Sequence, residues 1–150
     1  MSQYKWDAIL SYCWAQKSEV TKIYEDLTRD GFNVWRDVDQ MDGYLDESMA
    51  KGVLNSSIFI ACISSQYESS DNCKKEYRYA NTAKKKPRIT IVLQENFKPT
   101  DGSFLDFDFG QTLYYRLYPG PDYAEEYKNF VKALKKACPA SVFWLEFWLN

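Results

Sequence analysis

Five short hydrophobic runs are separated along the chain by segments whose apolar residues follow helical spacing. The runs begin near Trp6, Phe32, Ser57, Arg88 and Thr112. Their starts lie roughly 25 to 30 residues apart, which is enough chain for a strand, a crossover helix and two loops. The pattern therefore predicts an α/β domain in which strands and helices alternate.

The expected elements follow from the apolar spacing and from the residues that begin or end helices. Strands are expected over residues 6–12, 32–36, 57–63, 89–93 and 112–117. The last strand alternates polar and apolar residues and is expected at a sheet edge. Ser18 is predicted to cap a first helix that Gly31 ends, and Pro87 to stop a third helix that begins near Asp71. A short second helix carries Leu45, Met49 and Val53, and the last helix carries Tyr127, Phe130, Val131, Leu134 and Cys138.

Alternating strands and helices with right-handed crossovers predict a flavodoxin-like, doubly wound sandwich. Its five-stranded, mainly parallel sheet has the order 2-1-3-4-5 and helices on both faces. Ligands bind such sheets where the strand order reverses, here between strands one and three. The expected site therefore lies in the loops at residues 12–18 and 64–72. A phosphoacceptor receiver shares this topology but is not favoured, because Asp7 lies too early in its strand and strand three ends in Ser64 and Ser65.

Composition narrows the chemistry that this site can perform. The chain has 150 residues, the size of one domain, and its 19 basic and 21 acidic residues give a net charge of −2. A net charge this small does not indicate a nucleic-acid-binding protein, which is typically basic. The chain contains no histidine, which excludes histidine-based nucleophile activation, acid–base catalysis and metal ligation. Its four cysteines have no zinc spacing, and no metal site is expected.

Location and domain limits follow from the apolar runs. No run reaches membrane-spanning length, and Met1 is followed by polar residues, so we expect neither membrane insertion nor a signal peptide. A reduced, cytoplasmic protein is the expectation. Residues 1–138 are expected to form the domain, and the aromatic segment 139–150 to pack on it. A partner surface, or truncation of a longer chain, is an alternative explanation of that segment.

Glu76 is the strongest candidate for chemistry. It shares the inward stripe of its predicted helix with Cys73, Tyr77 and Ala80, where a carboxylate must be paired, hydrogen-bonded, protonated or open to a cleft. Its helix follows strand three, beside the expected switch point. A satisfied ion pair with a lysine or arginine is the structural alternative.

Two loops differ from the known ligand-binding motifs that they partly resemble. The loop after strand one, residues 13–18, has no glycine and is therefore neither a dinucleotide fingerprint nor a P-loop. Trp14 in this loop could stack on a base, or it could be a core or rim residue. The acidic loop at Asp37, Asp39 and Asp42 fails the calcium-loop pattern, because Met41 takes the fifth position and Ser48 the twelfth.

Five blocks of sequence, in order, resemble the Toll/interleukin receptor (TIR) domain family. YKWDAILSY at residues 4–12 is similar to the family's YDAFISY opening, and residues 31–37 are similar to its second strand. Asp42-Gly43 stands where the family has the BB-loop glycine. Residues 56–67 resemble the S-x-x-x-x-x-x-S-x-x-Y block, and residues 70–77 the S-x-W-C-x-x-E-L block. The resemblance runs from Tyr4 to about Leu93 and is weaker beyond it.

The resemblance implies the same fold and two alternative functions. Some family members are scaffolds that assemble through the BB loop in innate-immune signalling, by homotypic contact into oligomers or filaments. Others cleave NAD+ at the nicotinamide–ribose bond. NAD+ is their substrate, no further cofactor is implied, and the reaction depends on the glutamate that corresponds to Glu76. The resemblance implies an assembly loop containing Asp37, Asp39, Met41, Asp42, Gly43, Tyr44 and Leu45.

The NAD+-cleaving reading makes Glu76 the catalytic carboxylate of an NAD+ glycohydrolase or ADP-ribosyl cyclase. The residues expected to border the nucleotide are Tyr12, Cys13, Trp14, Asn72 and Cys73. Asn72 stands where many catalytic relatives have tryptophan, and Cys13 where serine is common. A non-enzymatic scaffold is the alternative; it does not need a glutamate in the buried stripe.

Overall fold

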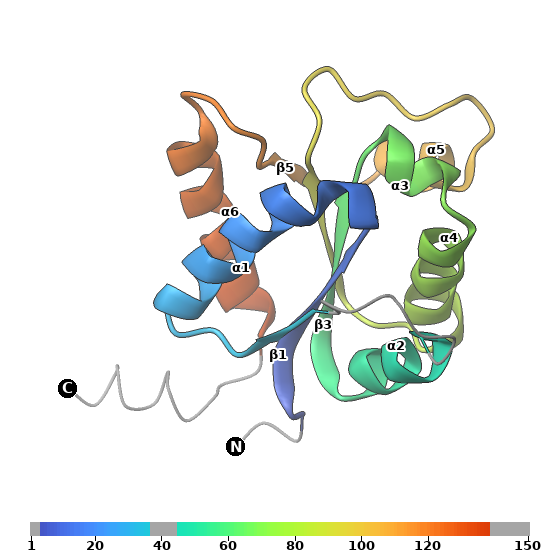
Figure 1. Ribbon diagram of the computed structural model, residues 1–150, viewed down its shortest axis with the longest axis horizontal. Coiled ribbons are helices and arrows are strands. Elements are labelled where there is room, and N and C mark those ends of the chain that lie inside the picture. The colour runs from blue at the N-terminus through green and yellow to red at the C-terminus, as the bar shows by residue number, and fades with distance from the viewer. Residues whose placement is uncertain (1–3, 37–44, 139–150) are drawn as a thin grey trace.

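The computed structural model describes residues 4–36 and 45–138 (Figure 1). The strands are β1 (Trp6–Tyr12), β2 (Val34–Trp35), β3 (Ser56–Ile63), β4 (Arg88–Val92) and β5 (Tyr114–Arg116). The helices are α1 (Lys17–Arg29), α2 (Leu45–Leu54), α3 (Ser65–Ser69), α4 (Asp71–Arg78), α5 (Phe104–Phe109) and α6 (Tyr123–Ala137). A 3₁₀ turn, Trp14–Gln16, precedes α1, and a π-helical turn, Tyr79–Ala83, continues α4.

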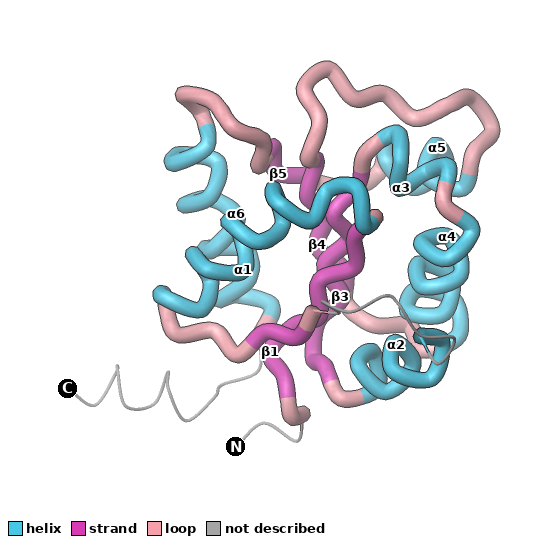
Figure 2. Tube along the Cα trace, in the orientation of Figure 1, coloured by secondary structure: helices cyan, strands magenta, loops and turns pink. Residues whose placement is uncertain are grey.

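The described strands form one five-stranded sheet in the order β2-β1-β3-β4-β5, with every pair parallel. The predicted fold and strand order are confirmed, including the edge position of β5. All eight residues of β3 are buried. A central strand covered on both faces requires this near-continuous apolar sequence. Figure 2 shows the strands as the middle layer between two layers of helices.

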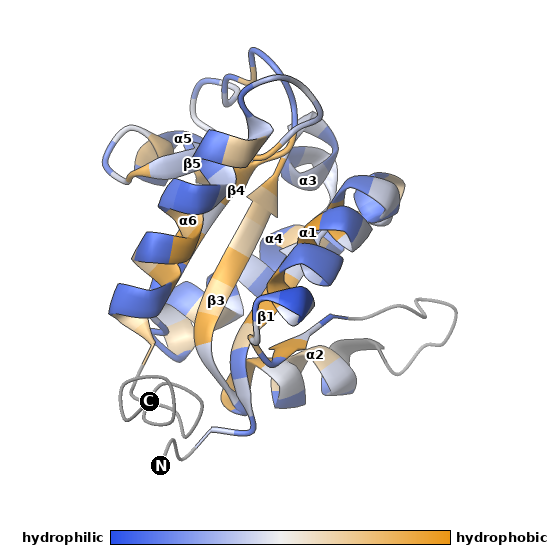
Figure 3. Cartoon of the chain, turned by 90° about the vertical axis from the view of Figure 1, so that its left-hand side faces the viewer, coloured by the Kyte–Doolittle hydropathy of each residue, from blue (hydrophilic) through white to orange (hydrophobic). Residues whose placement is uncertain are grey.

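Alternation along β1 divides the core between the two faces of the sheet. Ala8, Leu10 and Tyr12 join a buried cluster under α1 and α6, whereas Ile9 joins a second cluster under α2 and α4. Figure 3 shows apolar residues along β3 and polar residues on the outer sides of α1 and α6. Because successive side chains on a strand point to opposite faces, Ser11 must lie on the α2 and α4 face.

Gly31 ends the first helix as predicted. Its φ of 93° is left-handed, and the backbone N–H groups of Gly31 and Phe32 donate to the carbonyl oxygens of Thr28 and Leu27. These two bonds form a Schellman motif, which satisfies carbonyls that a helix end otherwise leaves unpaired. Glycine adopts the required backbone conformation without steric cost.

Three local predictions were wrong. Ser18 does not cap α1, because the 3₁₀ turn brings the helix start forward and makes Gln16 the N-cap. Helix α3 was not expected; it begins at Ser64, whose hydroxyl accepts from the Tyr67 backbone N–H. Helix α5 lies in a segment that was expected to be a loop, and it begins at Ser103, whose hydroxyl accepts from the Asp106 N–H.

Helices α1 and α6 are joined by two matched hydrogen bonds. The Tyr123 hydroxyl donates to Asp26 and the Tyr127 hydroxyl to Asp30, each at 2.7 Å. Asp26 is 8% exposed and is also paired with Lys22 and Arg29. Burial alone would raise the pKa of Asp26, but its hydrogen bonds and positive neighbours outweigh burial and hold the pKa below the ordinary 3.8.

We expect Tyr123→Phe to lower the free energy of unfolding by about 1–2 kcal/mol at pH 7, because it removes a hydrogen bond to a charged acceptor. The folded-state pKa of Asp26 is depressed, so this contribution is present above about pH 4 and declines as the pH falls further. Urea unfolding at several pH values measures both the loss of stability and its dependence on pH. Tyr115→Phe is the control, since that hydroxyl has no hydrogen-bond partner among the described residues. Equal losses for the two variants would contradict the prediction.

Candidate functional site

Glu76 lies on α4 and faces the carboxyl end of β1. The Ser11 hydroxyl donates to Glu76 Oε2 at 2.7 Å, and Ser11 Oγ is 2.8 Å from the Tyr67 hydroxyl. Ser11 is 1% exposed, Tyr67 is fully buried, and Glu76 is half-buried. Three elements, β1, α3 and α4, thus meet at one carboxylate beside the place where the strand order reverses.

The hydrogen bonds from Tyr67 to Ser11 and from Ser11 to Glu76 have one possible order of donors and acceptors. An ionised carboxylate only accepts, so the one hydroxyl proton of Ser11 is used on Glu76. The Tyr67 hydroxyl must therefore donate to Ser11. Burial, followed by the charge of Glu76, raises the pKa of Tyr67 well above its ordinary value and keeps this phenol protonated.

Glu76 opens on a cavity of about 270 Å³ between α2 and α4. The cavity is lined by Met49, Ala50, Val53, Asn72, Lys75, Glu76 and Tyr79. Apolar side chains of α2 form one wall, and the amide, ammonium, carboxylate and phenol of α4 and its π-helical continuation form the other. An apolar pocket with a few convergent polar groups is the usual form of a small-molecule site.

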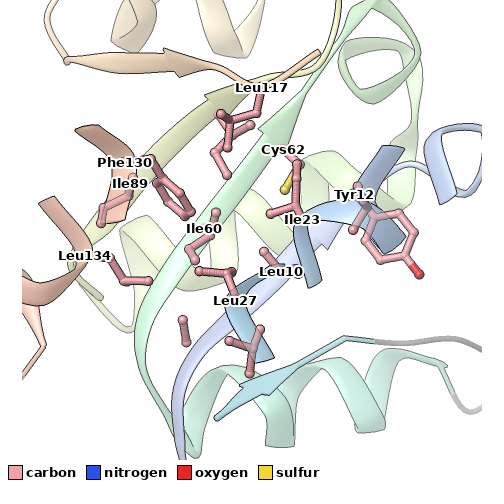
Figure 4. Packing of buried hydrophobic residues seen from close by; sticks show 14 of the residues in the cluster. Leu10, Tyr12, Ile23, Leu27, Ile60, Cys62, Ile89, Leu117, Phe130 and Leu134 are labelled. Carbon is pink, nitrogen blue, oxygen red and sulfur yellow. The ribbon is translucent and has the colours of Figure 1, made fainter. Parts of the chain in front are cut away.

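Of the residues expected to border a nucleotide, Asn72 lines this cavity together with Glu76. Tyr12 does not: it is 3% exposed and belongs to the cluster under α1 and α6, on the other face of the sheet (Figure 4). The expectation for Tyr12 is therefore corrected, because Ser11 and not Tyr12 has the strand parity that faces α4.

The other three expected residues are not among those that line the cavity. Cys73 is 3% exposed in the apolar cluster under α2 and α4, and Cys13 packs against that cluster. Trp14 is 41% exposed in the 3₁₀ turn, with the Lys17 ammonium 4.3 Å from its ring centre. A role for Cys13, Cys73 or Trp14 in substrate binding stays a prediction.

The expected assembly loop falls almost entirely outside the described residues. Asp37, Asp39, Met41, Asp42, Gly43 and Tyr44 belong to the segment 37–44. Leu45 is the first residue of α2. The assembly role of this loop stays a prediction.

Sequence reasoning missed Ser11, which donates to Glu76, and Tyr67, which is bonded to Ser11, as well as most of the cavity wall. Ser11 is a polar residue that follows the apolar stretch Ala8-Ile9-Leu10, and Tyr67 ends the serine-containing block after β3. Both positions could have been recognised from the sequence as polar groups close to the expected site. Met49 and Val53 were expected on a short second helix, and both lie buried on α2. These two side chains face Glu76 across the cavity because α2 packs beside α4. Local sequence patterns carry no information on that packing.

The chemistry available at this site is that of a carboxylate. Burial raises the pKa of the Cys73 thiol to about 12, so it is protonated and a poor nucleophile near neutral pH. Burial likewise raises the pKa of Cys62. Among the residues that the structure describes, no cluster of three or more cysteine, aspartate or glutamate side chains could hold a metal ion. Glu76 is therefore the best-placed charged group for stabilising a developing cation in the cavity.

A doubly wound parallel sheet with a carboxylate and a cavity beside the reversal of strand order defines a class of α/β domain with a site at the switch point. The family profile of the TIR domain matches residues 9–134 of the chain. The chain belongs to the TIR domain family. A comparison with curated protein sequences finds no match.

Solved structures share the fold at low sequence identity. The TIR domain of the Toll-related receptor TRR-2 from Hydra magnipapillata superposes with a TM-score of 0.66 and 15% identity, over 87% of this chain and 99% of that one. The RPS4–RRS1 TIR domain heterodimer superposes with a TM-score of 0.57 and 16% identity, over 87% of this chain and 96% of that one. The CMP N-glycosidase BcmB from Clostridium botulinum superposes with a TM-score of 0.55 and 14% identity, over 83% of this chain and 98% of that one.

None of the described helices has the length and apolar character needed to cross a membrane. The longest, α6, carries Glu125 and Glu126 in its first turn and Lys135 and Lys136 in its last, as the helix dipole favours.

Proposed function

We propose that this TIR domain cleaves NAD+ at the nicotinamide–ribose bond, with Glu76 as the catalytic carboxylate. The observation that carries the proposal is the placement of Glu76: its carboxylate is oriented by Ser11 and lines a cavity bounded by apolar residues. The products are nicotinamide and ADP-ribose, or a cyclic isomer if a nucleophile of the substrate itself attacks the ribose.

The reaction suits a site that has no histidine. Nicotinamide is already cationic in NAD+ and leaves as a neutral molecule, so no general acid is needed to protonate it. Positive charge then develops on the ribose carbon, as in glycoside cleavage. A carboxylate beside that carbon stabilises the charge electrostatically. Water, or the substrate's own nucleophile, completes the substitution and releases one proton when water attacks.

The size and lining of the cavity fit part of the substrate. A volume of about 270 Å³ lies just below the range of roughly 300–1,000 Å³ for sites that enclose a drug-sized ligand. The cavity accordingly holds the nicotinamide riboside half, with the ring against Met49 and Val53 and the ribose at Glu76. Lys75, on the rim of the same wall, is the cation available to the diphosphate.

The second candidate is a non-enzymatic scaffold that acts by homotypic TIR–TIR contact. Asn72 favours it, because many catalytic relatives have tryptophan at this position. The RPS4–RRS1 structure is a heterodimer of two TIR domains, which supports assembly of this kind as a proposal for this chain. In both proposals the protein acts in the cytoplasm, in innate-immune or cell-death signalling, and assembles through the loop at residues 37–45.

The test is nicotinamide release from NAD+ by the purified protein over a wide range of protein concentration, with and without a crowding agent. We expect release, and a rate per molecule that rises with concentration, because the resemblance to NAD+-cleaving TIR domains implies that the BB loop of a neighbouring subunit completes the site. Assembly without any nicotinamide release at any concentration would overturn the enzymatic proposal and favour the scaffold.

A further inference from the structure

We infer that Ser11 is a positioning residue for Glu76, and that Tyr67 fixes the direction of the Ser11 hydroxyl. The inference rests on the proposed function for its kinetic consequence, but the geometry it describes can be tested without catalysis. Ser11 has no place on the cavity wall and contacts no substrate in this proposal. It acts through the carboxylate.

The position of Ser11 makes it suited to this role. It lies near the carboxyl end of β1, where β1 is paired in register with the central strand β3. Its partner in β3 is Ala61, and both residues are buried. A donor on such a rigid strand is more precisely placed than one on a loop. The 2.7 Å bond to Glu76 Oε2 has the length of a charge-assisted hydrogen bond.

Tyr67 removes the remaining freedom of the Ser11 hydroxyl. A serine hydroxyl can rotate and can both donate and accept. Tyr67 is fully buried and its hydroxyl, which stays protonated, occupies the acceptor side of Ser11 Oγ. Helix α3, which carries Tyr67, is itself fixed by the Ser64 cap and by Glu68, whose carboxylate accepts from the Thr100 N–H and from the Ser103 hydroxyl.

The Ser11 hydrogen bond therefore fixes Oε2 of Glu76 relative to β1, in a residue that lines the cavity. Loss of this bond removes one restraint on the terminal torsion of Glu76, for which side chains have only a broad preference. A rotated carboxylate would still bind substrate nearby but would stabilise the charged transition state less well. Loss of an interaction made only in the transition state lowers kcat and leaves KM nearly unchanged.

The experiment compares Ser11→Ala with Ser56→Ala, a matched loss of a buried strand hydroxyl. Ser56 is fully buried on β3, and its hydroxyl donates to the Gly52 carbonyl oxygen at 2.6 Å, away from Glu76. We expect Ser11→Ala to lower kcat for nicotinamide release by about 10- to 100-fold with KM within about twofold, as loss of a hydrogen bond to a charged group predicts. Tyr67→Phe should give a smaller loss of kcat, because Ser11 still donates. Ser56→Ala should leave both constants unchanged. If the kcat of Ser11→Ala equals that of Ser56→Ala, the inference is overturned.

A second readout does not depend on activity. Infrared difference spectra between each protein and its Glu76→Gln derivative isolate the carboxylate stretching bands of Glu76. Loss of the Ser11 hydrogen bond should shift these bands in Ser11→Ala and not in Ser56→Ala. If the wild-type protein releases no nicotinamide, the proposed function fails, and the infrared shift alone decides whether Ser11 orients Glu76. Unshifted bands in Ser11→Ala would overturn the inference whatever the activity.

Discussion

Glu76→Gln is expected to reduce nicotinamide release from NAD+ by about 100- to 1,000-fold, the range seen when one electrostatic contact to a transition state is removed. The amide has nearly the same shape as the carboxylate, and its oxygen can still accept from Ser11, so the site keeps its geometry. What is lost is the negative charge beside the ribose carbon. The rate constant for nicotinamide release, followed by chromatography, measures the effect.

The control for this prediction is Glu47→Gln. Glu47 is an exposed carboxylate on α2 and is not among the residues that line the cavity. It changes the net charge of the protein by the same amount as Glu76→Gln. Release that falls equally in both variants would mean that overall charge, and not the carboxylate in the cavity, determines the rate.

The second large effect is expected at Gly52, where α2 packs directly on the sheet. A Cβ atom at this position would lie 2.9 Å from Cε3 of Trp35 and 3.0 Å from Cδ1 of Ile9. Gly52→Val must therefore push α2 away from the sheet or displace these side chains. Overpacking of this kind costs about 1–3 kcal/mol of the free energy of unfolding, more than a helical glycine costs by its own flexibility. Urea unfolding measures the loss.

Gly110→Val is the matched control, because a Cβ at Gly110 meets no atom within 4 Å and the backbone φ there is −72°. It should change stability by much less than Gly52→Val. The Gly52 variant should also lower nicotinamide release, since Met49 and Val53 lie within one turn of Gly52 and form the apolar wall of the cavity. If Gly52→Val unfolds at the same urea concentration as Gly110→Val, the close packing of α2 is not a source of stability.

The fold could be predicted because its signals are local and repeated. The apolar run of β3 has the sequence that a strand buried on both faces requires, and Gly31 marks a helix end with a backbone conformation that favours glycine. Helices α3 and α5 were missed although each has a serine N-cap, because helices of five and six residues show too little periodicity to be recognised. Short elements are fixed by their caps and by packing more than by pattern.

The candidate site was only partly predictable. The position of Glu76 on the inner stripe of its helix was enough to single it out. Tyr12 was expected to border the nucleotide, although the alternation of side chains along β1 places Ser11 and Tyr12 on opposite faces of the sheet. The cavity wall of Met49 and Val53 depends on the packing of α2 beside α4, which brings together residues from separate crossovers.

NAD+ is expected to bind in the cavity between α2 and α4, against Glu76. The methyl group of Met49 reports on it directly, because Met49 lines the cavity and the chain has three methionines in all. NAD+ is titrated into the Glu76→Gln variant, which is expected to turn NAD+ over only slowly, and the Met49 methyl resonance, assigned with Met49→Leu, is followed by NMR. We predict a saturable shift of that resonance at the protein and NAD+ concentrations where the wild type releases nicotinamide. A Met49 resonance that does not move under those conditions would place NAD+ elsewhere and contradict the account.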